Sequence, residues 1–316
     1  MRFRYCSIVI TVVLLATSLC LMKPEQEVNA VAARVPIQTD DAAVQNNTYQ
    51  LLQTSAEVSN LPASPQWALV YIDARDLWQN SDSGQNVVVA VLDTGIDDSC
   101  LGLAGKVIDA VNFSTSQTAG DVFGHGTEVA SIIAGTPEQG KTAGVSYNCR
   151  LLNVKVANDD GTVETAALAQ GIIWAASNGA DIINISIQIG EDDPGLNGAV
   201  QYAWGKGCVI VAAAGNNVGN SKIYPAAYSQ CISVTAVTPD GKLAPLSNGG
   251  NWVDVAAPGY NILTTSIGGV QKSVTGTSFA AAIVSGVAAD LFFSTSANNN
   301  QQTAVLALLR TVFPTS

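Results

Sequence analysis

A buried strand is predicted by the run Val87-Val88-Val89-Ala90-Val91-Leu92-Asp93-Thr94-Gly95. Its first six residues are apolar and mostly β-branched, which is typical of a strand covered on both faces in a parallel sheet. The run ends in Asp93, so a carboxylate lies at the carboxyl end of the strand. Ligands of open α/β sheets bind at that edge, and Asp93 is therefore a candidate functional residue.

Similar apolar runs recur along the chain and predict four more buried strands. These runs are Leu151 to Val156, Ile182 to Ser186, Val209 to Ala214 and Ile232 to Val237. Helical patterns lie between them, and the pattern from Glu164 to Ser177 ends at Asn178-Gly179, a typical helix C-cap. We therefore predict an α/β fold with one doubly wound parallel sheet and helices on both faces. Asp93, Ser186 and Asn216 all follow strands, at the ligand-binding edge.

The chain of 316 residues contains a single histidine, His125, in the run Phe123-Gly124-His125-Gly126-Thr127. This run has the character of a helix start. Imidazole takes and returns a proton near neutral pH because its unperturbed pKa is about 6.5. Any histidine-dependent mechanism in this chain must therefore use His125.

A serine occupies a comparable position further along, in Gly276-Thr277-Ser278-Phe279-Ala280. The apolar stretch from Ala281 to Leu291 follows directly, so Ser278 lies where a loop becomes a helix. Its hydroxyl then faces the positive end of the helix dipole, which suits a nucleophile.

These residues follow each other in the order Asp, His, Ser, and the chain resembles the subtilisin-like serine proteases, or subtilases, in which that order occurs. The resemblance covers about Leu61 to Ser316. Six segments carry it in the family's order: Val91 to Ile96, Gly124 to Thr127, Ala213 to Asn216, Tyr224 to Ala226, Ala256 to Gly259 and Gly276 to Ala280.

The resemblance implies a secreted serine endopeptidase that works through an acyl-enzyme intermediate. Ser278 is the expected nucleophile, His125 its general base, and Asp93 the group that orients and stabilises the imidazole. Asn216 resembles the family's side-chain donor to the oxyanion, with the Ser278 backbone N–H as the second donor.

The expected substrate cleft departs from the family's usual pattern. Subtilisins usually have a pair of glycines after the strand that ends at Ser186, whereas this chain has Ile187-Gln188-Ile189-Gly190. The loop between Asn216 and Tyr224 is short, as in thermitase, and brings Ile223 to the expected pocket floor. We therefore predict a narrowed pocket that prefers small or medium side chains before the scissile bond. The expected substrate-binding residues are Ser186, Ile187, Gln188, Ala214, Gly215 and Ile223.

The amino terminus is typical of a signal peptide. Arg2 and Arg4 precede an apolar stretch from Ile8 to Met22, and Val28-Asn29-Ala30 suits a cleavage site. An uncleaved anchor is the alternative. We predict a signal peptide over residues 1–30, a short pro-segment or linker over 31–60 and a peptidase domain over 61–316. The mature protein is expected to be secreted or periplasmic, free of the membrane and monomeric.

Four cysteines remain after removal of the signal: Cys100, Cys149, Cys208 and Cys231. Four cysteines in an exported chain allow three disulfide connectivities. The family layout suggests the pairing of Cys208 with Cys231, which leaves Cys100 for Cys149. Free buried thiols are the alternative.

Charge and metal-ligand patterns narrow the functional classes. The formal net charge of −11 argues against nucleic acid, because no basic stripe is present to neutralise phosphates. No cofactor is required, and no metal ligand is assigned. By resemblance, Thr136 to Thr142 occupies the family's calcium loop, where Glu138 could supply a ligand. However, Gly102 replaces a usual aspartate ligand, so a structural calcium ion is a weak expectation.

Two alternative functions are considered. The altered cleft is compatible with a dedicated processing protease that cuts a single partner protein. An inactive homologue that binds peptides is disfavoured, because Asp93, His125, Ser278 and Asn216 are all present. In each case the expected partner is a protein or peptide.

Overall fold

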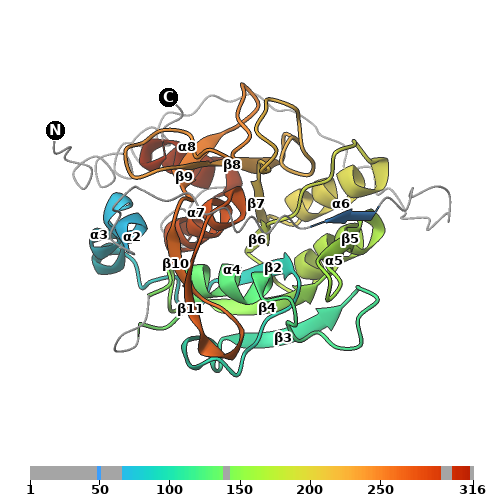
Figure 1. Cartoon of the computed structure of the whole chain (residues 1–316), viewed down its shortest axis with the longest axis horizontal. Helices are drawn as coiled ribbons and strands as arrows, with labels where there is room; N and C mark the ends of the chain where they lie inside the picture. The colour runs from blue at the N-terminus through green and yellow to red at the C-terminus, as the bar shows by residue number, and fades with distance from the viewer. Residues whose placement is uncertain (1–47, 51–65, 138–142, 293–300, 314–316) are drawn as a thin grey trace, which may run out of the picture.

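The fold is described from a computed structural model, and Figure 1 shows its arrangement. The description covers residues 48–50, 66–137, 143–292 and 301–313. The predicted signal peptide lies outside these residues. So does all of the predicted pro-segment except residues 48–50.

The core of the molecule is a seven-stranded parallel sheet with the strand order β3-β4-β2-β6-β7-β8-β9. β2 is flanked by β4 on one side and by β6 on the other, so the chain reverses its direction of travel across the sheet at β2. Such a switch point forms a crevice at the carboxyl ends of the strands, where ligands bind. The strands are β2 (Val88–Asp93), β3 (Val107–Asn112), β4 (Arg150–Lys155), β6 (Ile182–Ile185), β7 (Val209–Ala213), β8 (Cys231–Val237) and β9 (Val255–Pro258).

Helices cover both faces of this sheet, as predicted. Val89 and Val91 of β2 pack in the same apolar cluster as residues of α4 (His125–Ala134) and α7 (Thr277–Phe292). Ala90 and Leu92 alternate with them and pack with residues of α5 (Thr165–Ser177) and α6 (Pro194–Gly205). Figure 1 shows α5 and α6 side by side, apart from α4 and α7. The alternation follows from the two-residue period of a strand.

The helix α7 runs through the middle of the protein, and all sixteen of its residues are buried. Its sequence is rich in alanine, which lets neighbouring elements approach closely. A Cβ atom added at Gly286 would lie 2.5 Å from Cβ of Val145. Three further helices surround this layer: α2 (Trp67–Tyr71), α3 (Ala74–Asn80) and α8 (Gln301–Val312).

All five strands predicted from the sequence are present, and each of their ends is shifted by one residue or less. The sequence did not indicate β3 or β9. β3 lies at an edge of the sheet and is largely exposed, so it lacks the apolar run of a buried strand. A hairpin of β10 (Ile262–Thr265) and β11 (Gln271–Val274) was also missed, and it lies beside α4 in Figure 1. Two short 3-10 turns span Leu101–Leu103 and Ile267–Gly269.

A second small sheet joins the predicted pro-segment to the rest of the chain. β1 (Thr48–Gln50) pairs antiparallel with β5 (Thr162–Glu164), with Tyr49 opposite Val163. Gly161, just before β5, packs under the ring of Phe123, since a Cβ atom there would lie 2.8 Å from that ring. β1 therefore lies on a strand that adjoins the loop leading to His125.

Candidate active site

Asp93 and His125 meet at the carboxyl edge of the sheet. β2 ends at Asp93 and α4 begins at His125. The imidazole Nδ1 lies 2.8 Å from Asp93 Oδ1 and 2.9 Å from Oδ2, and both side chains are buried. Because the carboxylate only accepts hydrogen bonds, Nδ1 carries the proton and Nε2 of the neutral ring is left as an acceptor.

The protonation of His125 is set by opposing influences. Burial favours the neutral ring and by itself lowers the pKa of His125. The charge and hydrogen bond of Asp93 act in the other direction, with help from Glu128 and Asp121, and the net effect raises the pKa above its usual value. The imidazolium that forms during proton transfer is therefore stabilised.

The close approach of α4 to β2 depends on a glycine. A Cβ atom added at Gly126 would lie 2.1 Å from the carbonyl oxygen of Gly95 and 3.1 Å from Cβ of Asp93. A side chain at this position would force the start of the helix away from the strand. The Gly126 N–H also donates to Thr94 Oγ1 at 2.9 Å, which fixes the same junction.

Ser278 lies in the first turn of α7, and the residue after it packs against His125. The ring of the next residue, Phe279, has its centroid 5.5 Å from that of His125. The Ser278 hydroxyl donates a long hydrogen bond of 3.4 Å to the carbonyl oxygen of Ser186, and the Ser186 hydroxyl donates to the Ser278 carbonyl at 3.2 Å. In the described part of the structure the Ser278 hydroxyl makes no hydrogen bond to His125, and in many ligand-free enzymes the bond from nucleophile to base is long or poorly aligned until substrate binds.

The orientation of the Asn216 amide is fixed by its neighbour Thr277. Asn216 Oδ1 accepts hydrogen bonds from the Thr277 N–H at 2.9 Å and from the Thr277 hydroxyl at 3.0 Å. A backbone N–H can only donate, so this contact assigns the oxygen and leaves the Nδ2 group as the other end of the amide. Nδ2 lies toward Gly276, two residues before Ser278, and is 3.3 Å from the position of a Cβ atom added at Gly276.

Gln188 spans the segments that were expected to line the substrate pocket. Its Oε1 accepts from the backbone N–H of Asn216 at 3.1 Å, and its Nε2 donates to Asn217 Oδ1 at 3.4 Å. Gly215 lies beneath it with a positive φ of 97°. A Cβ atom there would lie 2.9 Å from Gln188 Oε1 and 3.2 Å from Ile223 Cγ1. Gln188, Gly215 and Ile223 are thus neighbours.

The other expected pocket residues are buried. Ile187 and Ile189 are 2% and 1% exposed and pack in the apolar cluster of α5 and α6, so it is Gln188, between them, that reaches the Asn216 segment. Ser186 and Ala214 are also buried, at the ends of β6 and β7.

Asp121 is a residue of this site that the sequence analysis missed. Its carboxylate accepts hydrogen bonds from Thr94 Oγ1, from the Gly124 N–H, and from both the N–H and the hydroxyl of Thr127. Its hydrogen bonds therefore link the segment after Asp93 to the residues on either side of His125. The available signal was its position four residues before the single histidine, without an apolar pattern around it.

Residues 84–311 match the family model described as Peptidase S8, subtilase family. The chain belongs to the subtilase family. It is similar to the thermophilic serine proteinase of Bacillus sp. (strain AK1), with 40% identity over 70% of this chain and 56% of the relative. The chain thus spans little more than half of that relative. Thermitase of Thermoactinomyces vulgaris is 37% identical over 72% of this chain and 81% of thermitase.

Subtilases are serine proteases, so the family implies protein substrates. The relatives differ in their named location. One is an intracellular serine protease of Paenibacillus polymyxa, 36% identical over 76% of each chain, and another is a minor extracellular protease of Bacillus subtilis (strain 168), 36% identical over 67% of this chain and 33% of the relative. No helix in the described parts of this subtilase is long and apolar enough to cross a membrane.

The expected calcium loop, Thr136 to Thr142, is described only at residues 136 and 137. Gly102 offers no side-chain oxygen, and its carbonyl accepts a hydrogen bond from the Thr136 N–H at 2.8 Å. Glu138, the other expected ligand, lies outside the described residues. Within the described ranges, no group of three or more His, Cys, Asp or Glu side chains is arranged to hold a metal ion.

The predicted disulfides are wrong for this structure, in which the four cysteines are free and buried. β7 and β8 are neighbours as expected, but Cys231 lies opposite Ile210, two residues beyond Cys208. This offset separates the two Cα atoms by about 8 Å, beyond the reach of a disulfide. The Cys208 thiol instead donates to the Ala180 carbonyl, and the Cys100 thiol to Asp97. Burial raises the pKa of Cys149 to about 12, so that thiol is unreactive.

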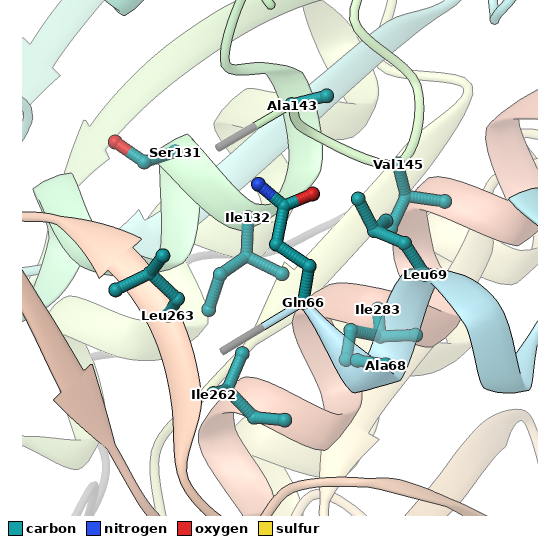
Figure 2. Close-up of a pocket in the computed structure, with 10 residues that line it drawn as sticks. All are labelled: Gln66, Ala68, Leu69, Ser131, Ile132, Ala143, Val145, Ile262, Leu263 and Ile283. Atoms are coloured by element: carbon teal, nitrogen blue, oxygen red, sulfur yellow. The ribbon is translucent and has the colours of Figure 1, made fainter. Parts of the chain in front are cut away.

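A separate pocket lies between α2, α4, α7 and β10 (Figure 2). Its volume is about 20 Å³, which is room for a single water molecule. It is too small for a substrate side chain and is not part of the candidate active site. Its lining residues are Gln66, Ala68, Leu69, Ser131, Ile132, Ala143, Val145, Ile262, Leu263 and Ile283.

Proposed function

We propose that this subtilase is a secreted serine endopeptidase with the catalytic triad Asp93, His125 and Ser278. The observation that carries the proposal is the contact of His125 Nδ1 with Asp93 at 2.8 Å. It leaves Nε2 as the base, on a ring that packs beside Phe279, the residue after Ser278. In this proposal Ser278 is the nucleophile, His125 the base, Asp93 the orienting carboxylate and Asn216 an oxyanion donor.

The proposed reaction begins when Ser278 Oγ attacks the carbonyl carbon of the scissile bond and passes its proton to His125 Nε2. Asp93 stabilises the imidazolium that forms. The oxyanion of the tetrahedral intermediate accepts hydrogen bonds from Asn216 Nδ2 and from the Ser278 N–H. The intermediate collapses as His125 gives its proton to the leaving amine. Water then attacks the acyl-enzyme by the same route, which releases the acid and restores Ser278.

The location and processing of the protein belong to the same proposal. A basic start followed by the apolar stretch from Ile8 to Met22 supports export through a signal peptide over residues 1–30. The pairing of β1 with β5 supports a pro-segment role for residues 31–60, because it holds part of this segment on the peptidase domain. We propose that the mature enzyme acts as a monomer, without a cofactor or a catalytic metal ion.

A dedicated processing protease is the second candidate. The observation that favours it is the Gln188 side chain, which lies across the pocket segments where the family usually has backbone alone. Digestion of denatured casein beside a panel of folded proteins distinguishes the two candidates. A general endopeptidase degrades casein, whereas a dedicated enzyme leaves it intact.

A serine-directed fluorophosphonate tests the mechanism. We expect it to label Ser278 alone and to label nothing after denaturation, because only the assembled site activates the hydroxyl. Labelling that survives denaturation, or that occurs at another serine, would contradict the triad. A chelator should leave the turnover of a chromogenic peptide unchanged on the time scale of the assay, and an immediate loss would rule out the metal-free mechanism.

A further inference from the structure

Glu128 is a buried carboxylate that lies one helical turn after His125, on the same helix. It is 1% exposed. Its Oε1 accepts a hydrogen bond from the Ser266 hydroxyl at 2.8 Å and lies 2.7 Å from Lys272 Nζ. In the described part of the chain, Oε2 has no hydrogen-bond partner. A buried carboxylate with an unused oxygen is unfavourable for folding, so its presence calls for a reason.

Outside its own helix, the partners of Glu128 come from the hairpin β10–β11 and the turn between its strands. Lys272 lies on β11 and Ser266 in the turn, while Thr264 on β10 donates through its hydroxyl to the Glu128 carbonyl at 2.7 Å. Through these contacts the hairpin packs against the first turn of α4. Because His125 is the first residue of α4, the same contacts hold the helix end that carries the imidazole.

We propose that Glu128 is a positioning residue for His125, and that the Glu128–Lys272 pair sets the pH at which the imidazole becomes a base. This inference rests on the proposed function. Glu128 does not contact substrate. It acts by holding the helix start and by placing a negative charge near the ring, whose effect Lys272 partly offsets.

Other charged or titratable groups lie around His125 and Glu128, on the elements packed against α4. Asp93 on β2 and Asp121 in the preceding loop add negative charge near the imidazole, in the same direction as Glu128. Lys155 on β4 is opposite Asp93 in the sheet but is paired with Asp159. On the hairpin side, Asp97 accepts from the Gly268 N–H and the Cys100 thiol contacts the Ser266 carbonyl. Ser278 and Phe279, from α7, are uncharged.

The test uses three variants: Glu128→Gln, Lys272→Gln and the double variant. Loss of the negative charge destabilises the imidazolium, so Glu128→Gln should move the acidic limb of kcat/KM to lower pH. Loss of the positive charge should move it to higher pH in Lys272→Gln. Each shift should be about half a unit to one unit, and the double variant should lie between the single variants. Lys272→Arg keeps the charge and should leave the limb in place.

The single histidine gives a second measurement that does not need activity. Because the chain contains one imidazole, its proton NMR signal can be followed through a pH titration without assignment, also in a Ser278→Ala background. Shifts of opposite sign in Glu128→Gln and Lys272→Gln support the inference. A Glu128→Gln midpoint that is unchanged or raised, or shifts of the same sign in both variants, overturns it.

If the parent enzyme has no peptidase activity, the proposed function fails, whatever the titration shows. Lys272 lies at the surface and is 41% exposed, so its variant should fold even if Glu128→Gln does not, and an unchanged midpoint in it would overturn the inference.

Discussion

The Thr94 hydroxyl donates a hydrogen bond of 2.9 Å to Asp121 Oδ1, and this contact joins the two segments that carry Asp93 and His125. The same carboxylate accepts from the Gly124 N–H at 2.8 Å, directly before the histidine. Asp121 is therefore an organiser of the site, although it does not contact the imidazole through a hydrogen bond in this structure.

Replacement of Asp121 by alanine should reduce both stability and activity. Four hydrogen bonds to the carboxylate are lost, and each donor left buried without a partner costs about 1 to 3 kcal/mol. We expect a lower melting temperature and a kcat/KM reduced at least about tenfold, because small misplacements of catalytic groups have large effects. Thermal unfolding and peptide kinetics measure the two effects. Asp98→Ala removes an exposed carboxylate nearby and should change neither, and an Asp121→Ala protein with parental kinetics would exclude the organising role.

Replacement of Ser278 or His125 by alanine should abolish peptidase activity and preserve the fold. Because the two residues act as one unit, each single variant should lose at least about 10³-fold in kcat, and the double variant should be no worse than either. Hydrolysis of a chromogenic peptide measures the loss, and circular dichroism checks the fold. A Ser278→Ala protein within tenfold of the parent would refute the triad.

The pocket should prefer alanine, valine or leucine before the scissile bond to phenylalanine or tyrosine. Gln188 and Ile223 flank Gly215, so little room is left for a large ring. Overfilling a packed site costs about 1 to 3 kcal/mol, which corresponds to about 10- to 200-fold in discrimination.

The variant Gln188→Gly should restore room and raise the ratio of kcat/KM for Phe to that for Ala by about tenfold or more. A matched peptide series that varies only the residue before the scissile bond provides the measurement. Gln117→Gly, in an exposed loop, is the control for a general effect of glycine. A parent enzyme that cleaves after Phe as well as after Ala would show that Gln188 moves aside.

Asp290, near the end of α7, should make the stability of the protein depend on pH. Burial raises its pKa to about 7, while a hydrogen bond from the Ser146 hydroxyl at 2.8 Å opposes that rise. Between about pH 4 and pH 7 the folded protein therefore holds a proton that the unfolded chain releases. The free energy of unfolding falls with rising pH in this window, by at most about 1.4 kcal/mol per unit from this group.

The variant Asp290→Asn removes this titration and keeps a polar group for Ser146. The melting temperature of the variant minus that of the parent should be larger at pH 8 than at pH 5. Measurements in the Ser278→Ala background avoid self-cleavage. An equal difference at both pH values would mean that Asp290 titrates at its ordinary pKa.

The pairing of β1 with β5 should hinder the binding of extended peptides to the unprocessed chain. β5 adjoins the loop before His125, and the edge of β5 that pairs with β1 is not open to an added peptide strand. In the Ser278→Ala background, Tyr49→Pro should weaken the pairing and lower the Kd for a fluorescent peptide. Ala33→Pro, in the same segment but outside β1, is the control. An unchanged Kd in Tyr49→Pro would contradict the pro-segment proposal.

The sequence predicted the buried strands well because an apolar strand leaves a strong local signal. An uninterrupted apolar run such as Val87 to Leu92 has few structural interpretations, and a lone histidine between glycines stands out. β3 gave no such signal, since an exposed edge strand needs no apolar run. The role of Asp121 depends on contacts between distant loops, and the cysteine prediction failed because strand adjacency does not fix register. The register between two strands and the contacts between two loops are set by tertiary structure, and a local sequence pattern does not encode them.

The burial of α7 along its whole length bears on the resistance of the protein to self-digestion. A protease digests whatever backbone becomes accessible, including that of its neighbours in solution. Since every residue of α7 is buried, we expect its amide hydrogens to exchange slowly with solvent. We therefore expect the segment that carries Ser278 to be among the last to become cleavable, so that cleavage within it requires unfolding of the surrounding core.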